Sequence, residues 1–122
     1  MAIDQKFINQ FASVTSKAAV ASYKLVGKKD KIAADKAAVD SMRNELNKLN
    51  VDGKIVIGEG ELDEAPMLYI GEKVGTTRGP EIDIAVDPLE GTNFAANNLP
   101  GALSVIAIAE KNNLFHAPET YM

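Results

Sequence analysis

The segment Ile82–Thr92 is the part of the sequence that most constrains the fold of this chain. Isoleucine and valine alternate with aspartate and alanine over residues 82–87, a pattern that predicts a β-strand. We expect the strand to end at Asp87, because Pro88 has no backbone N–H for a ladder hydrogen bond and favours an extended conformation at the residue before it. The sequence therefore predicts an aspartate at a strand end, directly before a turn.

The turn after this strand carries several oxygen donors. Glu90 supplies a second carboxylate, Leu89 a backbone carbonyl and Thr92 a hydroxyl, while Gly91 permits a tight turn or the close approach of a ligand. Hard cations such as Mg²⁺ and Mn²⁺ prefer ligand sets made only of oxygen. The spacing alone leaves two interpretations open, a cation site and a solvated Asp-Pro turn with a capping acid.

Charge and composition narrow the function classes. With 122 residues the chain is one domain at most, and its net charge of −4 argues against binding nucleic acid through a basic face. Nine of its 17 acidic residues lie within residues 59–90, whereas ten of its 13 basic residues precede residue 59. Such an acidic middle would repel a phosphate ester unless cations intervened, which favours a bound metal.

The residue types that are missing or rare exclude other kinds of site. The absence of cysteine excludes disulfides and thiolate zinc sites, and a single histidine excludes a His-rich zinc site. No apolar run approaches the ~20 residues that span a membrane, and the first residues do not have the pattern of a signal peptide. We therefore expect a cytoplasmic protein with neither a membrane nor a nucleic acid as partner.

Hydrophobic periodicity predicts helices in the first part of the chain and strands in the second. Helices are expected over residues 3–26 and 35–50, strands over residues 54–57, 67–74, 82–86, 102–109 and 114–116, and loops over residues 59–66 and 93–101. Gly27 should stop the first helix, and Asp35 should begin the second, where the helix dipole favours an ionised carboxylate. The expected fold is α/β, with the two helices layered on a mixed, largely antiparallel sheet.

Two blocks of sequence resemble a known family. Residues 87–92, Asp-Pro-Leu-Glu-Gly-Thr, resemble the signature of the lithium-sensitive sugar phosphatase superfamily, which includes the inositol monophosphatases and the fructose-1,6-bisphosphatases. Residues 55–75 are similar to the class II, bacterial or GlpX-type, fructose-1,6-bisphosphatases. The resemblance covers nearly the whole chain but only the N-terminal part of much longer proteins. It implies a sugar phosphatase fold that is incomplete without a downstream half, so we expect residues 1–122 to be the N-terminal, metal-binding part of that domain.

The resemblance also implies a reaction and residues for it. The reaction is hydrolysis of fructose 1,6-bisphosphate to fructose 6-phosphate and phosphate, with two or more Mn²⁺ or Mg²⁺ ions. The implied metal ligands are Asp35, Glu59, Asp87, Glu90 and the Leu89 carbonyl; the implied catalytic residues are Lys31, Asp35, Asp63 and Thr92; and the implied substrate contacts are Glu90, Gly91, Thr92 and Tyr121.

Several of these positions have a simpler interpretation. Asp35, which the resemblance pairs with the Thr92 hydroxyl, could be only a helix cap, and Asp63 could be an N-cap. Lys31 could be a solvated surface lysine, and Glu61 could face solvent. His116 stands where the family usually has asparagine, and we expect it at the surface or a strand end and not as a base.

The sequence leaves rival functions. The first alternative is a sedoheptulose-1,7-bisphosphatase or a dual-substrate enzyme. An inositol monophosphatase is a less well supported alternative, because Glu90 stands where that branch usually has aspartate. A non-catalytic metal-binding or assembly module is the rival from another class. The apolar strand over residues 102–109 would expose one face and one edge if the chain stood alone. We therefore expect a homo-oligomer, or pairing with a complementary downstream segment.

Overall fold

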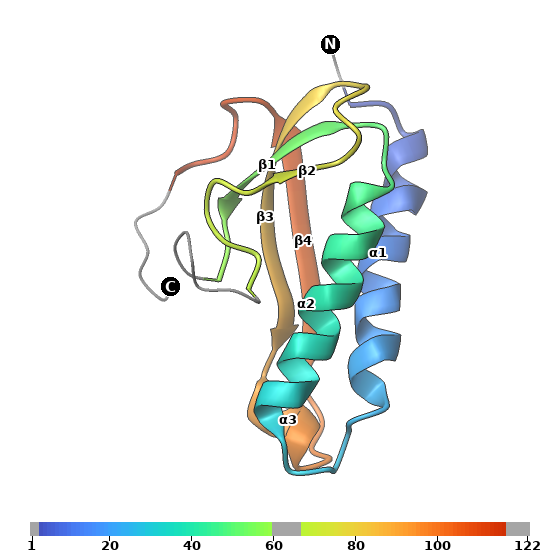
Figure 1. Cartoon of the computed structure of the whole chain (residues 1–122), viewed down its shortest axis with the longest axis vertical. Helices are drawn as coiled ribbons and strands as arrows, with labels where there is room; N and C mark the ends of the chain where they lie inside the picture. The colour runs from blue at the N-terminus through green and yellow to red at the C-terminus, as the bar shows by residue number, and fades with distance from the viewer. Residues whose placement is uncertain (1–2, 60–66, 117–122) are drawn as a thin grey trace.

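The computed structural model describes residues 3–59 and 67–116 and shows two long helices packed on one face of a four-stranded sheet (Figure 1). The elements are α1 (Lys6–Tyr23), α2 (Lys31–Asn47), β1 (Asp52–Ile57), β2 (Lys73–Val74), β3 (Glu81–Glu90), α3 (Thr92–Ala96) and β4 (Leu103–Glu110). The strand order is β2-β1-β3-β4, with the central pair β1 and β3 parallel and the two outer pairs antiparallel. The predicted α/β fold, with two helices on a mixed and largely antiparallel sheet, is confirmed.

The core lies between the two helices and the sheet. Apolar residues of α1 recur at steps of three and four, which places them on one buried stripe. The buried positions of α1 are Phe7, Phe11, Val14, Ala18 and Ser22, and those of α2 are Ala34, Ala38, Val39, Met42 and Leu46. The apolar residues among them form one core cluster with Ile55 of β1 and Ile84 of β3, which are both fully buried.

The second helix begins earlier than predicted. Asp30 caps it, because its carboxylate Oδ1 accepts a hydrogen bond of 3.0 Å from the backbone N–H of Ala33. Asp35 therefore lies in the second turn of α2, and its predicted place at the helix N-terminus is wrong. Lys31 is the first residue of the helix.

The first helix ends at Tyr23, three residues before the predicted end. Gly27 lies in the connection to α2 with a φ of +76°, and its N–H donates to the Ala95 carbonyl at 2.9 Å. The glycine thus joins this connection to α3, in place of stopping the helix as predicted. The short helix α3 itself occupies the start of the segment predicted as a polar loop.

The central strand β3 continues through Asp87 and Pro88 to Glu90, so the predicted stop at Asp87 is wrong. Asp87 pairs with Val105 and Glu90 with Leu103, which leaves one extra residue on β3 between the two pairs. This bulge accommodates Pro88, because a bulge leaves residues outside the ladder and proline has no N–H to donate to it.

Two other predicted strands are shorter or missing. Only Lys73 and Val74 of the predicted strand 67–74 pair with β1, because residues 67–72 form an irregular segment held by side-chain contacts described below. Residues 114–116 pair with no strand among the described residues. Their chain follows a turn in which the Asn112 N–H donates to the Asp83 carboxylate at 2.9 Å.

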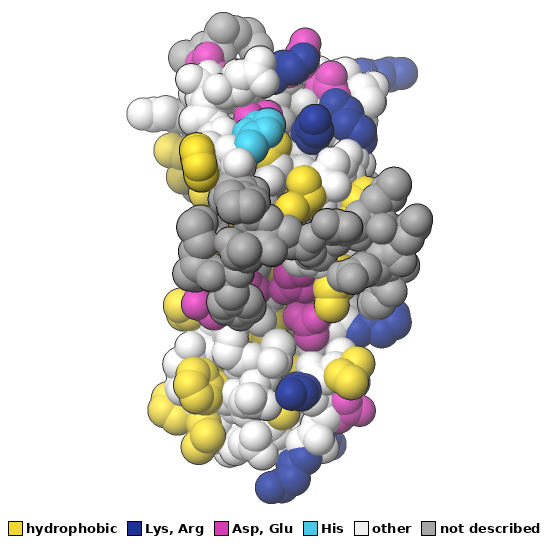
Figure 2. Space-filling model, turned by 90° about the vertical axis from the view of Figure 1, so that its left-hand side faces the viewer, with side chains coloured by type: hydrophobic (Ala, Val, Ile, Leu, Met, Phe, Trp, Pro, Cys, Tyr) yellow, Lys and Arg dark blue, Asp and Glu magenta, His cyan; other side chains and the backbone are white. Residues whose placement is uncertain are grey.

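The face of the sheet opposite the helices is partly open. Ile84 and Val86 of β3 lie in the core, so the alternation of the strand turns Asp87 to the other face, where it lies opposite Val105 of β4. Leu103 is 56% exposed and Val105 is 42% exposed on that face. In Figure 2, which shows this side, hydrophobic side chains are visible above and below a group of acidic ones. Within the described residues β4 is also an edge strand, as expected for residues 102–109.

No helix in the described part of the chain is long and apolar enough to cross a membrane.

Candidate metal centre

The parallel pairing of β1 and β3 brings two acidic residues together. Ile57 of β1 pairs with Ala85 of β3, and two residues further along each chain stand Glu59 and Asp87. Because parallel strands run in the same direction, these two carboxylates leave the sheet at the same end. The register of the strands thus allows the two acids to share one metal ion, and their predicted role as metal ligands stays a prediction.

Asp35 joins this pair from α2. Burial raises the pKa of the Asp35 carboxyl, and the negative charge of Asp87 raises it further. Burial is also the largest cause that raises the pKa of Glu59 to about 8, followed by the charge of Asp35 and by a hydrogen bond with Asp87. Asp87 therefore lies near enough to Asp35 and Glu59 for its charge to oppose the ionisation of both.

Two oxygens of this cluster have no hydrogen-bond partner among the described residues. Asp35 Oδ1 and Glu59 Oε2 are both buried and both unpaired. A buried oxygen without a donor costs about 1–3 kcal/mol, so native proteins usually satisfy such atoms. A divalent cation would do so here, and carboxylate oxygens are the donors that Mg²⁺ and Mn²⁺ prefer.

The described residues supply part of a ligand set. Among them, no group of three or more acidic, histidine or cysteine side chains is arranged so that it could hold an ion alone. The unpaired oxygens and the raised pKa values of Asp35 and Glu59 nevertheless fit a cation in this cluster. The predicted acids Glu61, Asp63 and Glu64 lie outside the described residues, as does Tyr121.

The backbone around Gly58 fixes the position of Glu59. A Cβ atom at Gly58 would lie 2.5 Å from the Leu68 carbonyl oxygen and 2.8 Å from Ile55 Cγ2, so no other residue fits without a shift of the backbone. This close approach lets the Glu59 N–H donate to the same Leu68 carbonyl at 2.9 Å. The glycine that the sequence placed beside Glu59 for approach to a ligand is needed for contact with the chain itself.

The turn after the bulge places the remaining signature residues. Gly91 has a φ of +82°, and a Cβ atom there would lie 2.8 Å from Phe94 Cδ2. Thr92 begins α3, Leu89 has its side chain in the core, and Glu90 is exposed. The metal-binding and substrate-binding roles of these residues stay predictions.

Three other predicted positions are placed by the structure. No hydrogen bond joins Asp35 to the Thr92 hydroxyl among the described residues, and the unpaired Asp35 Oδ1 is free to accept one. Lys31 is exposed at the start of α2. His116 is exposed, as expected, with Nε2 3.6 Å from Asp83 Oδ2.

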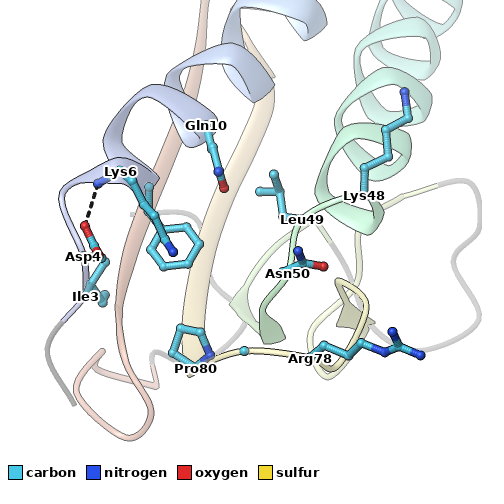
Figure 3. A pocket seen from close by; sticks show the side chains of 11 residues that line it. Ile3, Asp4, Lys6, Gln10, Lys48, Leu49, Asn50, Arg78 and Pro80 are labelled. Atoms are coloured by element: carbon cyan, nitrogen blue, oxygen red, sulfur yellow. Dashed lines mark hydrogen bonds between the residues drawn. The ribbon is translucent and has the colours of Figure 1, made fainter.

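A cavity lies away from these carboxylates, between the start of α1, the end of α2 and residues 78–80 (Figure 3). Its volume is about 680 Å³, and its lining includes Lys6, Lys48 and Arg78. In Figure 3 the Lys48 and Arg78 side chains extend in different directions and do not converge on a common point. The cavity therefore has no arrangement that identifies a ligand.

The raised pKa of Glu59 predicts how pH affects stability without metal. The Glu59 carboxyl has its ordinary pKa of 4.5 in the unfolded chain and a pKa of about 8 in the folded chain, so the folded state binds more protons between these values. The free energy of unfolding of the metal-free chain should therefore fall as pH rises from 4.5 to 8. Glu59→Gln should weaken this dependence, because it removes the carboxyl group that takes up the proton.

Urea unfolding in the presence of a chelator, at several pH values, measures this effect. Glu81→Gln is the matched control, because it removes an exposed carboxylate at the far end of β3. A Glu59→Gln chain with the same pH dependence as the parent would contradict the raised pKa.

Comparison with known proteins identifies the family. A family model described as bacterial fructose-1,6-bisphosphatase, glpX-encoded, matches residues 5–122, and the chain belongs to this family. The class 2 fructose-1,6-bisphosphatase 1 of Escherichia coli K12 is 58% identical over 113 residues, which cover 93% of this chain and 34% of that protein. The resemblance seen in the sequence is confirmed.

Cyanobacterial relatives carry a second activity in their names. A protein of Synechococcus sp. CC9902, named D-fructose 1,6-bisphosphatase class 2/sedoheptulose 1,7-bisphosphatase, is 52% identical over 120 residues, or 98% of this chain and 36% of that protein. A relative of the same name from Prochlorococcus marinus MIT 9515 matches to the same extent. The chain spans about a third of the length of the curated relatives that it matches.

Sequence reasoning missed one pair of residues near this site. Arg43 and Glu72 lie 29 residues apart and form an ion pair with an Nε–Oε2 distance of 2.8 Å. Arg43 lies outside both blocks that carry the family resemblance, and Glu72 lies within residues 55–75 but was given no role there. No local pattern in the sequence indicates that Arg43, in a predicted helix, contacts Glu72, in a segment predicted as a strand.

Proposed function

We propose that this chain is the N-terminal, metal-binding part of a phosphatase that hydrolyses fructose 1,6-bisphosphate to fructose 6-phosphate and phosphate. The observation that carries the proposal is the pair of buried, unpaired carboxylate oxygens of Asp35 and Glu59 beside Asp87, in a chain of this family. Acidic side chains buried against one another suit a bound cation and are costly without one.

The cofactor that fits is Mn²⁺ or Mg²⁺, in two or more copies. The candidate ligands are the carboxylates of Asp35, Glu59, Asp87 and Glu90 and the carbonyl of Leu89, all oxygen donors. A bound divalent ion supplies Lewis acidity, lowers the pKa of a water molecule and offsets negative charge on the phosphoryl oxygens. The acidic cluster could not approach a phosphate ester without such ions, because like charges repel.

The residues of this chain would bind the sugar phosphate and orient the attacking water. The Thr92 hydroxyl, at the first residue of α3, and the Asp35 carboxylate orient the attacking water. Glu90, Gly91, Thr92 and Tyr121 contact the sugar phosphate, and Asp63 and Lys31 assist at the reacting phosphate. Such positioning matters because phosphoryl transfer depends mainly on alignment and charge stabilisation.

Thr92→Ala should separate catalysis from metal binding. In a protein that joins this chain to the downstream part of the family, turnover should fall by about 10² or more, because the water loses its alignment. The affinity for Mn²⁺ should stay near that of the parent, since the carboxylate ligands remain. Steady-state kinetics and calorimetry measure the two effects.

The control for this substitution is Thr15→Ala, which removes the same groups from a partly exposed position of α1, far along the chain from the signature residues. It should leave turnover and Mn²⁺ affinity unchanged. Equal losses of turnover and affinity in Thr92→Ala would mean that Thr92 is a ligand or a structural residue.

A second substrate is favoured by the names of the cyanobacterial relatives, which include sedoheptulose 1,7-bisphosphatase. Phosphate release from both sugar bisphosphates, measured in the same joined protein with Mn²⁺ and with EDTA, tests substrate and metal together. Release from one or both sugars that EDTA abolishes supports the proposed function. Release that survives complete chelation contradicts the metal mechanism, and no release from either sugar favours a non-catalytic metal-binding module.

A further inference from the structure

We propose that Arg43 is a positioning residue that holds Glu59 in place to receive a cation, acting through residues 67–72. This inference rests on the proposed metal centre and adds to it a residue outside the proposed ligand set. It follows from a continuous series of contacts that begins on α2 and ends at the backbone of Glu59.

The first contacts join Arg43 to both ends of segment 67–72. Its guanidinium forms two hydrogen bonds with the Glu72 carboxylate, Nε to Oε2 at 2.8 Å and Nη2 to Oε1 at 3.0 Å. Nη2 also donates to the Met67 carbonyl at 2.6 Å. The Glu72 side chain is only 11% exposed and that of Arg43 is 25% exposed. A two-point contact of this kind, shielded from water, is stronger and more directional than a single exposed ion pair.

The next contacts join the same segment to the end of β1. The Ile55 N–H donates to the Glu72 carbonyl at 2.9 Å, and the Gly71 N–H donates to the Ile55 carbonyl at 2.7 Å. Beyond Gly58, the Glu59 N–H donates to the Leu68 carbonyl at 2.9 Å. Leu68 itself is fully buried in the core. A displacement of residues 67–72 would therefore move the backbone of Glu59.

The helix that carries Arg43 also carries Asp35. Eight residues separate the two, which is about 12 Å along the axis of α2. Asp35 and Glu59 are thus both placed by the same rigid helix, Asp35 directly and Glu59 through Arg43 and segment 67–72. This arrangement keeps two carboxylates of the cluster at a fixed separation, as a small cation of strict geometry requires.

The direction in which metal affinity changes when Arg43 is replaced distinguishes a positioning role from a simple effect of its charge. The positive charge of Arg43 opposes the binding of a cation nearby, so its removal would strengthen metal binding if charge were all that mattered. If Arg43 positions Glu59, its removal weakens metal binding instead. Loss of groups that orient metal ligands usually costs 10–100-fold in affinity.

The experiment measures Mn²⁺ affinity by calorimetry in this chain and its variants. We expect Arg43→Gln to weaken binding about tenfold, the lower end of that range, because Arg43 acts through the backbone and not on a ligand side chain. Arg43→Lys keeps the charge but not the planar fork, so it should fall between the parent and Arg43→Gln. It also keeps the test valid if Arg43→Gln fails to fold.

The control is Lys17→Gln, which breaks the 2.9 Å ion pair between α1 and Glu45 of α2 and leaves residues 67–72 untouched. It should bind Mn²⁺ as the parent does. Hydrogen exchange of the metal-free chain provides a second measurement. The amides of Glu59 and Gly71 should lose protection in the Arg43 variants, while amides in the middle of α1 keep theirs.

The outcomes distinguish this inference from the proposed function. Glu59→Gln is measured alongside, and if it binds Mn²⁺ as tightly as the parent, the metal centre is wrong and the role of Arg43 is overturned with it. If Glu59→Gln weakens binding but both Arg43 variants bind as well as or better than the parent, only the role of Arg43 is overturned.

Discussion

The purified 122-residue chain should release phosphate from fructose 1,6-bisphosphate far more slowly than the roughly 1–10³ per second that is typical of enzymes. The chain spans about a third of the length of its curated relatives, so most of their sequence has no counterpart here. Contacts that orient the ester supply much of a catalytic rate, and their loss costs orders of magnitude. Phosphate release at saturating Mn²⁺ measures the difference, and turnover within the typical range would contradict it.

The same chain should self-associate in solution. β4 is an edge strand among the described residues, and Leu103 and Val105 are exposed on the face opposite the helices. An open edge beside exposed apolar side chains favours pairing with another chain, either a second copy or a downstream segment. Val105→Lys should reduce this association, because it places a charge on the exposed apolar face.

Val20→Lys is the matched control for this association, since Val20 is 61% exposed on α1, away from the sheet. It should leave the mass in solution as it is in the parent. Light scattering coupled to gel filtration gives that mass for all three proteins. A parent chain that stays monomeric at high concentration, or an equal effect of both lysines, would contradict an associating β4 face.

Asp87→Ala should weaken the binding of Mn²⁺ or Mg²⁺ by tenfold or more. Asp87 lies beside Glu59 at the end of the parallel strands, and its charge raises the pKa of both Asp35 and Glu59. If Asp87 is a ligand, as proposed, its loss removes one carboxylate from the cation. The loss also relieves the repulsion in the metal-free cluster, and both changes reduce the free energy gained when a cation binds. Calorimetric titration of the metal-free chain measures the change in affinity.

Glu81→Gln is the control, because it removes one negative charge from the other end of the same strand. A general effect of net charge would weaken binding equally in both variants. A loss confined to Asp87→Ala supports a local site, whereas unchanged affinity in that variant would remove Asp87 from the ligand set.

The sequence predicted the layers of the fold because its periodicity is strong. The steps of three and four between Phe7, Phe11 and Val14 define a helix face, and the alternation in residues 82–87 defines a strand. The predicted boundaries of the helices and strands were wrong where a contact elsewhere in the chain outweighed a local sequence rule. Pro88 was expected to end β3, but a bulge accommodates it, and Asp30 caps α2 ahead of Asp35.

The candidate site could be predicted only in part. The motif resemblance named Glu59 and Asp87 as candidate ligands, which stays a prediction, and the register of the two parallel strands accounts for their proximity. The contact between Arg43 and Glu72 depends on how α2 packs against residues 67–72, and no local pattern in a single sequence contains that information. Likewise, only the three-dimensional structure shows that the Asp35 and Glu59 oxygens are buried without a hydrogen-bond donor in the described part of the chain.

The number of protons released when Mn²⁺ binds tests the metal centre most directly. At pH 7 the Glu59 carboxyl, with its pKa raised to about 8, is mostly protonated in the metal-free chain, and a metal ligand must give up its proton. Calorimetry in buffers of different ionisation enthalpy should therefore show the release of about one proton per chain at pH 7, and close to none in Glu59→Gln. Binding without proton release in the parent, or equal release in both proteins, would contradict a cation held by this carboxylate cluster.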